Sequence, residues 1–233
     1  MPLLSRYHPG SYTEEQYNLE KRIVRHSLFV SGSFIVILWL TKLFEVEFDL
    51  DFSTLGVLPH DVTGLRGIIL SPLIHANFKH LIANTIPLFI LAFSLFFFYR
   101  KSAYTIFFLI YLFSGVFVWL GGREALHIGA SGLIYGLAAF LFLSGIISFN
   151  IRLLTISMIV ALVYGGMFWG IFPLKPEISW ESHLWGGVSG FGLAFFYRKS
   201  APVALREEET EDIEDIKSED EIEPEEDSTV ENN

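Results

Sequence analysis

The stretch Gly129-Ala130-Ser131-Gly132 opens an apolar run, residues 133–149, that carries no formal charge. A serine inside such a run would be unremarkable, because its hydroxyl can bond to a carbonyl one turn earlier. A serine at the start of the run, with glycines on both sides, instead indicates a position that another group approaches closely. The run is close to the ~20 residues that a helix needs to cross the hydrocarbon of a bilayer. We therefore expect Ser131 at one end of a membrane helix.

Five further apolar runs flank this one. These five runs cover residues 27–40, 81–99, 103–120, 153–172 and 178–197. Together with the run after Ser131 they predict an all-α polytopic membrane protein of six transmembrane helices. Residues 42–79 differ, because acids and bases alternate there with apolar residues and turn formers. Such a composition is typical of an interfacial segment.

The distribution of Lys and Arg predicts the orientation of these helices. With the N-terminus in the cytoplasm, the cytoplasmic connections contain Lys21, Arg22, Arg25, Arg100, Lys101, Arg152, Arg198 and Lys199. The opposite connections hold acids and bases in balance. An excess of Lys and Arg inside is the usual orientation signal, so we expect both termini in the cytoplasm of a plasma (inner) membrane protein.

Acidic charge is concentrated at the C-terminal end. Residues 201–233 hold 15 of the 26 acidic residues and only two bases. A segment of this composition contains too few apolar groups for their burial to offset the entropy that the chain loses on ordering. We therefore expect a cytoplasmic segment (1–26), a membrane domain (27–199) and a disordered acidic cytoplasmic tail (200–233). No cleavable signal peptide is expected, since residues 1–20 lack an apolar core. The absence of Cys excludes disulfides and thiol chemistry, and no feature predicts a nucleic-acid partner.

The predicted topology brings three polar residues to one membrane face. His80, Ser131 and His183 each lie near the start of a helix that runs from outside to inside. At 1.5 Å per residue, Ser131 and His183 lie ~30 and ~22 Å from the cytoplasmic ends of their helices, in the outer half of the bilayer. Ionisable residues within a membrane indicate a functional site.

Small residues predict which helices touch. Gly132 and Gly136 form one G-x-x-x-G pattern, and Gly186 and Gly190 form another; such faces allow membrane helices to pack closely. If they meet, Ser131 comes within hydrogen-bond reach of His183, as a base-activated serine requires. Tyr135 is expected to pack on the His183 ring. No Asp is placed to complete a triad, so a dyad is predicted.

A second polar pair adds donors for an oxyanion. His80 and Asn84 are four residues apart and lie on one helix face. Together with the Ser131 N–H they supply the neutral donors that acyl transfer needs. Taken singly, such a pair, or a G-x-x-x-G, more often serves only packing. The convergence at one membrane face is what favours a serine-hydrolase site.

These motifs resemble those of the rhomboid intramembrane serine proteases. The resemblance covers roughly residues 20–198 and is carried by His80-Leu-Ile-Ala-Asn84, Gly129-Ala-Ser131-Gly132 with Tyr135, and His183-Leu-Trp-Gly186-Gly-Val-Ser-Gly190. It implies a six-helix rhomboid-like bundle with Ser131 as nucleophile, His183 as general base, and His80 and Asn84 as oxyanion stabilisers. It further implies a supporting role for His75, a membrane-embedded first loop at 42–79, a lateral gate with Phe168 and Trp169, and a cap at 172–181. The implied activity is cleavage of transmembrane segments of membrane-protein substrates, without a cofactor or metal.

Two positions depart from the family pattern. Its Trp-Arg pair in the first loop is matched only by Leu65-Arg66, and the residue before the catalytic histidine is Ser182, preceded by Glu181, where alanine is usual. Neither change removes a catalytic group. His8, His26, His60 and His127 are interpreted as loop or interfacial residues without a role.

Three other classes of function were weighed. A metal site is disfavoured because His75 and His80 have no acid close in sequence and no H-E-x-x-H motif is present. A transporter is disfavoured because the spans lack ionisable groups at mid-membrane. The remaining alternative is a catalytically inactive rhomboid-like protein that binds membrane clients, although such relatives typically lack the serine or the histidine.

Overall fold

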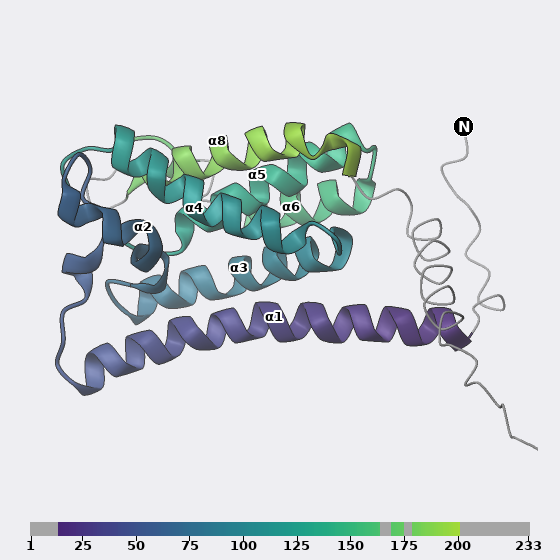
Figure 1. Cartoon of the computed structure of the whole chain (residues 1–233), viewed down its shortest axis with the longest axis horizontal. Helices are drawn as coiled ribbons and strands as arrows, with labels where there is room; N and C mark the ends of the chain where they lie inside the picture. Colours follow the sequence, from purple (N-terminus) through teal and green to yellow (C-terminus); the bar gives the residue numbers. More distant parts are fainter. Residues whose placement is uncertain (1–13, 164–168, 175–178, 201–233) are drawn as a thin grey trace, which may run out of the picture. The chain divides into compact units, whose positions relative to one another are not determined.

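The computed structural model describes residues 14–163, 169–174 and 179–200. Within these ranges the chain is helical (Figure 1), with α1 (Glu14–Glu47), α2 (Gly67–Leu70), α3 (Phe78–Phe98), α4 (Ala103–Gly121), α5 (Ser131–Ile147), α6 (Ile151–Val163) and α8 (Trp180–Phe196). Short 3-10 helices lie at Ser53–Leu55, Val62–Arg66, Ser71–Leu73 and Arg198–Ser200. The chain divides into a unit of residues 23–202 and a second unit of residues 1–22 and 203–233. The first unit contains all the predicted site residues.

Each predicted membrane run overlaps a helix, but the bounds of the first run were wrong. The first run was predicted at 27–40, whereas α1 extends from Glu14 to Glu47, because the Glu, Lys and Arg residues around the apolar run also favour helix. Residues 42–47 therefore belong to α1 and not to the first loop. The fifth run was predicted at 153–172; α6 is described from Ile151 to Val163, and residues 164–168 lie outside the described part, so the end of this run stays a prediction.

Length and composition distinguish the helices further. Among the described residues, α1, α3 and α4 are long and apolar enough to cross a membrane, whereas α5 and the described part of α6 are apolar but shorter. A helix of 17 residues, such as α5, is ~26 Å long, which is less than the ~30 Å thickness of a bilayer's hydrocarbon core.

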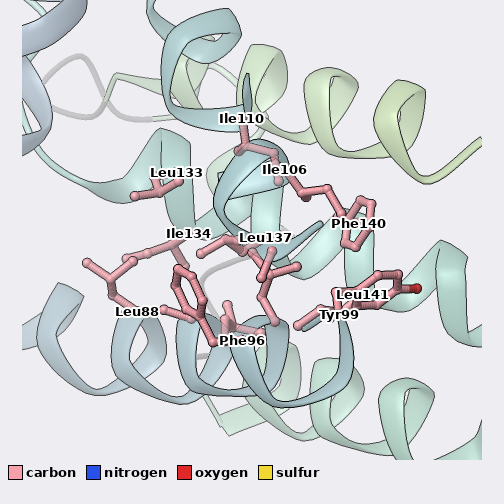
Figure 2. Packing of buried hydrophobic residues seen from close by; sticks show 14 of the residues in the cluster. Leu88, Phe96, Tyr99, Ile106, Ile110, Leu133, Ile134, Leu137, Phe140 and Leu141 are labelled. Carbon is pink, nitrogen blue, oxygen red and sulfur yellow. The ribbon is translucent and has the colours of Figure 1, made fainter. Parts of the chain in front are cut away.

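The core of this unit is built around α5. Its side chains at 133, 134, 137, 140 and 141 are all buried, and they pack against α3 and α4 (Figure 2). The uncharged run after Ser131 predicts a membrane helix, and the structure shows in addition that α3, α4, α6 and α8 pack against this helix. Ser131, the starting residue of α5, is partly buried.

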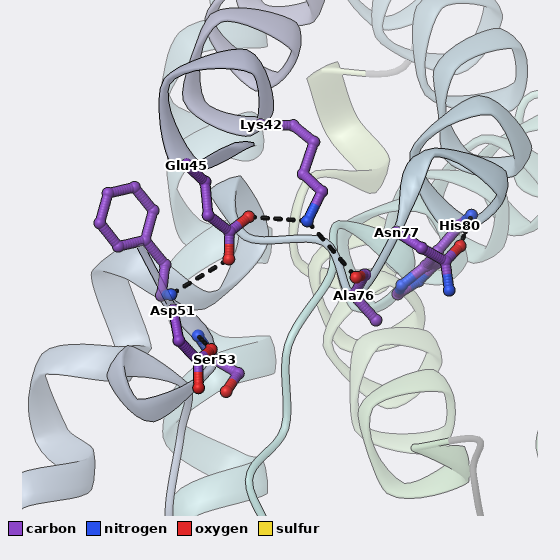
Figure 3. Close-up of polar contacts among 8 residues, drawn as sticks. Lys42, Glu45, Asp51, Ser53, Ala76, Asn77 and His80 are labelled. Carbon is purple, nitrogen blue, oxygen red and sulfur yellow. Dashed lines mark hydrogen bonds and ion pairs between the residues drawn. The ribbon is translucent and has the colours of Figure 1, made fainter. Parts of the chain in front are cut away.

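The end of α1 is connected to the first loop by a buried ion pair (Figure 3). Lys42 Nζ lies 2.8 Å from Glu45 Oε2 and donates to the carbonyl oxygen of Ala76 at 3.4 Å. Glu45 Oε1 accepts the N–H of Phe52 at 3.1 Å. The pair therefore joins α1 both to the start of the loop and to the segment immediately before α3, where Asn77 caps the helix.

Candidate active site

Ser131 is the first residue of α5, as the glycine-flanked motif predicts. The N–H groups of a first helical turn have no partners within their own helix, and the helix dipole makes that end favourable for negative charge. Gly129 precedes the helix with φ +109°, a conformation that glycine adopts readily. Its N–H donates to the carbonyl of Ser71 at 2.8 Å, which attaches the motif to the first loop.

Gly129 also makes room for the predicted oxyanion pair. A Cβ atom built on Gly129 would lie 2.9 Å from His80 Nε2 and 3.8 Å from Asn84 Nδ2, so both side chains of α3 reach this turn. Asn77 positions them, because its side chain accepts the backbone N–H of His80 at 2.9 Å and caps the helix. The structure thus brings His80 and Asn84 to the segment that carries Ser131.

An unpaired polar atom marks this part of the site. Asn84 is 5% exposed, and its Nδ2 has no hydrogen-bond partner in the described structure. Buried amide donors are normally paired, so a free one beside a helix N-terminus is suited to an incoming oxyanion. His75 is also buried, and its ring meets that of His80 edge to face at 5.1 Å.

The two glycine faces meet as predicted. A Cβ atom built on Gly186 would collide with the carbonyl oxygen of Gly132, and one on Gly190 would collide with that of Gly136. α5 and α8 therefore touch backbone to backbone over this stretch, as small residues allow in membrane helices. The contact places the starts of the two helices, with Ser131 and His183, next to each other.

The His183 ring is held by two contacts. Tyr135 stacks on it, with ring centroids 4.1 Å apart and planes 5° from parallel, which confirms the predicted packing. Nδ1 lies 2.8 Å from the carbonyl oxygen of Gly170. A carbonyl can only accept, so Nδ1 carries the hydrogen and Nε2 keeps its lone pair. No described residue bonds that Nε2.

The predicted hydrogen bond between Ser131 and His183 is not formed among the described residues; the bonded nitrogen of His183 is Nδ1. Catalytic hydrogen bonds are often long before substrate binds and tighten in the complex. The residue that orients the imidazole is Gly170, which sequence reasoning missed. A backbone carbonyl leaves no signature in a sequence. The glycine itself is required, since a Cβ there would collide with the Tyr135 hydroxyl.

His127, interpreted from the sequence as a loop or interfacial residue without a role, is buried and hydrogen-bonded through both ring nitrogens. Its ring is 2% exposed, with Nδ1 2.5 Å from Ser179 Oγ and Nε2 3.1 Å from the Arg123 carbonyl oxygen. Burial lowers the pKa of His127 below its usual 6.5 and the Arg123 carbonyl partly opposes this, so the ring is neutral near pH 7. In the sequence, the only indication that His127 lies close to the site is its position two residues before Gly129.

The acid beside the proposed base is buried. Glu181 is 1% exposed, and Oε1 lies 3.5 Å from Arg123 Nε. Neither carboxylate oxygen has a hydrogen bond within the described residues. Arg123 thus pairs with an acid of α8, where a headgroup or loop anchor was expected.

The gate and cap are only partly visible. Phe168 and residues 175–178 lie outside the described residues, while Trp169 is 60% exposed. The Arg66 side chain donates to the Thr54 carbonyl at 3.1 Å within the first loop. Within the described ranges, no three His, Cys, Asp or Glu residues are grouped so that they could hold a metal ion.

Comparison with known proteins relates the chain to one family and to several relatives. A family model described as the Rhomboid domain matches residues 63–200. An uncharacterized protein of Mycobacterium tuberculosis (strain ATCC 25618 / H37Rv) is 35% identical over 179 residues, which cover 73% of this chain and 74% of the relative. An uncharacterized protein of Mycobacterium leprae (strain TN) is 34% identical over 184 residues, covering 73% and 70%.

Proposed function

This chain belongs to the rhomboid family, and from that premise and the geometry around Ser131 we propose that it is an intramembrane serine endopeptidase. Its substrates are membrane proteins, cleaved within or beside a transmembrane segment. The observation that carries the proposal is the meeting of three features at the start of α5. These are a serine at a helix N-terminus, an unpaired buried amide at Asn84, and the His183 ring with Nε2 available.

In the proposed reaction, Ser131 Oγ attacks the carbonyl carbon of the scissile peptide while His183 Nε2 takes the hydroxyl proton. The oxyanion that forms accepts hydrogen bonds from the Ser131 N–H, Asn84 Nδ2 and His80. His183 then returns the proton to the leaving amine, and water hydrolyses the acyl-enzyme. The Gly170 carbonyl and the stacked Tyr135 ring keep Nε2 directed at the reacting groups, in the role that a third residue plays in a triad.

The environment strengthens these interactions. Donors directed at a developing charge act more strongly in a site shielded from water. The site lies at the end of a helix shorter than the thickness of the hydrocarbon core, which supports a position of Ser131 below the membrane surface. We further propose that the six apolar segments form a six-helix bundle with both termini in the cytoplasm and with the site toward the external face, since Lys and Arg accumulate in the opposite connections. A substrate helix would enter sideways and unwind locally to expose its peptide bond.

Cleavage of a fluorescent transmembrane substrate by purified protein tests the proposal. We expect wild type to cleave, and Ser131→Ala and His183→Ala to abolish turnover. Asn84→Ala is expected to lower the rate by about 10²–10³, the usual cost of one oxyanion donor. Ser144→Ala is the matched control, because Ser144 is buried on the same helix α5 but three to four turns from the site; it should cleave like wild type.

A fluorophosphonate gives a second readout. It is expected to label wild type and the Ser144→Ala protein but not Ser131→Ala. Equal cleavage by wild type and Ser131→Ala would refute the assignment. A wild type that binds transmembrane helices but neither cleaves them nor reacts with the fluorophosphonate would instead support the inactive, client-binding relative.

A further inference from the structure

His127 joins three segments of the chain through all four of its polar groups. Its backbone N–H and C=O pair with Val57 of the first loop, at 2.9 and 3.0 Å. Its ring nitrogens bond Ser179, immediately before α8, and the carbonyl of Arg123, immediately after α4. A buried histidine with every polar group paired across segments is strongly constrained in position. None of these bonds belongs to the proposed catalytic step.

The direction of each side-chain bond follows from its chemistry. The Arg123 carbonyl can only accept, so Nε2 of His127 carries the hydrogen and the Nδ1 of the neutral ring must accept. Ser179 therefore donates its hydroxyl hydrogen to Nδ1. Ser179 Oγ also lies 2.6 Å from Ser182 Oγ, and since its own hydrogen is used, Ser182 must donate. The result is a directed chain from Ser182 through Ser179 to His127, which we call the His127 network.

The two ends of the His127 network lie next to the proposed catalytic residues. Ser182 directly precedes His183, and a Cβ atom built on Gly132 would lie 3.1 Å from the Ser182 carbonyl oxygen. His127 lies four residues before Ser131, at the start of the turn that leads into α5. The network therefore connects the turn that carries the nucleophile to the first turn of the helix that carries the base.

We propose that His127 is a positioning residue for the proteolytic reaction, holding the turn before Ser131 at a fixed distance from the start of α8 through Ser179 and Ser182. The proposal rests on the proposed function, because the position it explains is that of Ser131 relative to His183. A displacement of about 1 Å at reacting groups can cost about 10²-fold in rate. Since the catalytic pair is not hydrogen-bonded before substrate binds, its alignment depends on such neighbouring connections.

Steady-state kinetics of His127→Leu test this role. Leucine approximates the volume of the ring but makes neither hydrogen bond, so we expect kcat to fall about 10- to 100-fold with KM within about twofold. His127→Asn, which keeps an acceptor near the position of Nδ1, should recover part of that loss. Ser179→Ala should also lower kcat. The kcat of the double variant His127→Leu with Ser179→Ala should be close to that of the slower single variant, because both substitutions remove the same chain of hydrogen bonds.

Ser189→Ala is the matched control. Ser189 is a buried serine of α8 whose hydroxyl bonds the Trp185 carbonyl of its own helix at 2.7 Å, so its loss should leave kcat unchanged. Should His127→Leu fail to fold, Ser179→Ala and Ser182→Ala, which each remove one hydroxyl, decide the question. Wild-type kcat in both of these variants would overturn the proposal.

Nitrogen-15 NMR of labelled histidine tests the network without activity. We expect His127 to have a protonated Nε2 and a bare Nδ1, and Ser179→Ala to shift the Nδ1 resonance. A protonated Nδ1 at neutral pH would overturn the proposal. If wild type cleaves and Ser131→Ala does not, while His127→Leu retains full kcat, the positioning role alone fails. If wild type does not cleave, the proposed function fails and the positioning role fails with it.

Discussion

Replacing Gly186 by alanine would place a methyl group against the backbone of α5. The added Cβ would lie 2.8 Å from the carbonyl carbon and 3.0 Å from the Cα of Gly132, and closer still to its carbonyl oxygen. Carbon atoms in contact are normally separated by ~3.5–4.0 Å, so α5 and α8 must move apart by about 1 Å. Backbone atoms cannot rotate out of the way as a flexible side chain can.

Two losses follow from that displacement. Overpacking of a close contact costs about 1–3 kcal/mol of stability. A separation of about 1 Å between the helices that carry Ser131 and His183 should lower kcat/KM by about 10²-fold. Gly187→Ala is the control, because nothing lies within 4 Å of a Cβ built on the neighbouring Gly187.

The assay is cleavage of a transmembrane substrate, run together with thermal unfolding in the same detergent. We expect Gly186→Ala to lose both activity and thermal stability, and Gly187→Ala to keep both. Gly186→Ala with the activity of Gly187→Ala would refute the reasoning that the glycine contact sets the distance between nucleophile and base.

Three further outcomes are expected from measurements of thermal unfolding. Arg123→Met should destabilise more than Glu181→Gln, by about 1–2 kcal/mol, because it leaves a buried carboxylate without its ion pair; the reverse order would show that Glu181 is not held by that charge. Lys42→Met should cost about 3 kcal/mol by isolating the buried Glu45 carboxylate, and Lys42→Met with Glu45→Leu should be less harmful than Lys42→Met alone. The pKa of His127 is lowered in the folded protein, so unfolding takes up a proton and the free energy of unfolding decreases as pH falls below about 6.5. The decrease in the free energy of unfolding between pH 7.5 and 5.5 should be smaller in His127→Leu than in wild type. An equal decrease in the two proteins would contradict a buried neutral ring.

Much of the site follows from local features of the sequence. The uncharged run after Ser131 predicts a membrane helix, and small residues four apart on two runs predict which helices touch. Both patterns depend only on which residues stand close together along one helix, so they can be recognised in the sequence without coordinates. The i, i+4 spacing of His80 and Asn84 is of the same kind. The ends of α1 were mispredicted because charged residues with high helix propensity extend the helix beyond its apolar run.

Contacts between segments distant in the chain were decided by the tertiary structure alone. The Gly170 carbonyl that fixes the His183 tautomer is a backbone group, and every residue has one, so no residue type marks it. The bonds from His127 to Ser179, 52 residues away, depend on how two loops meet at the end of the bundle. The Gly129-Ala130-Ser131-Gly132 motif by itself determined that a serine stands at the start of a helix. The packing of α3, α5 and α8 decided which side chains reach that serine, since directed hydrogen bonds depend on distances that helix packing alone sets.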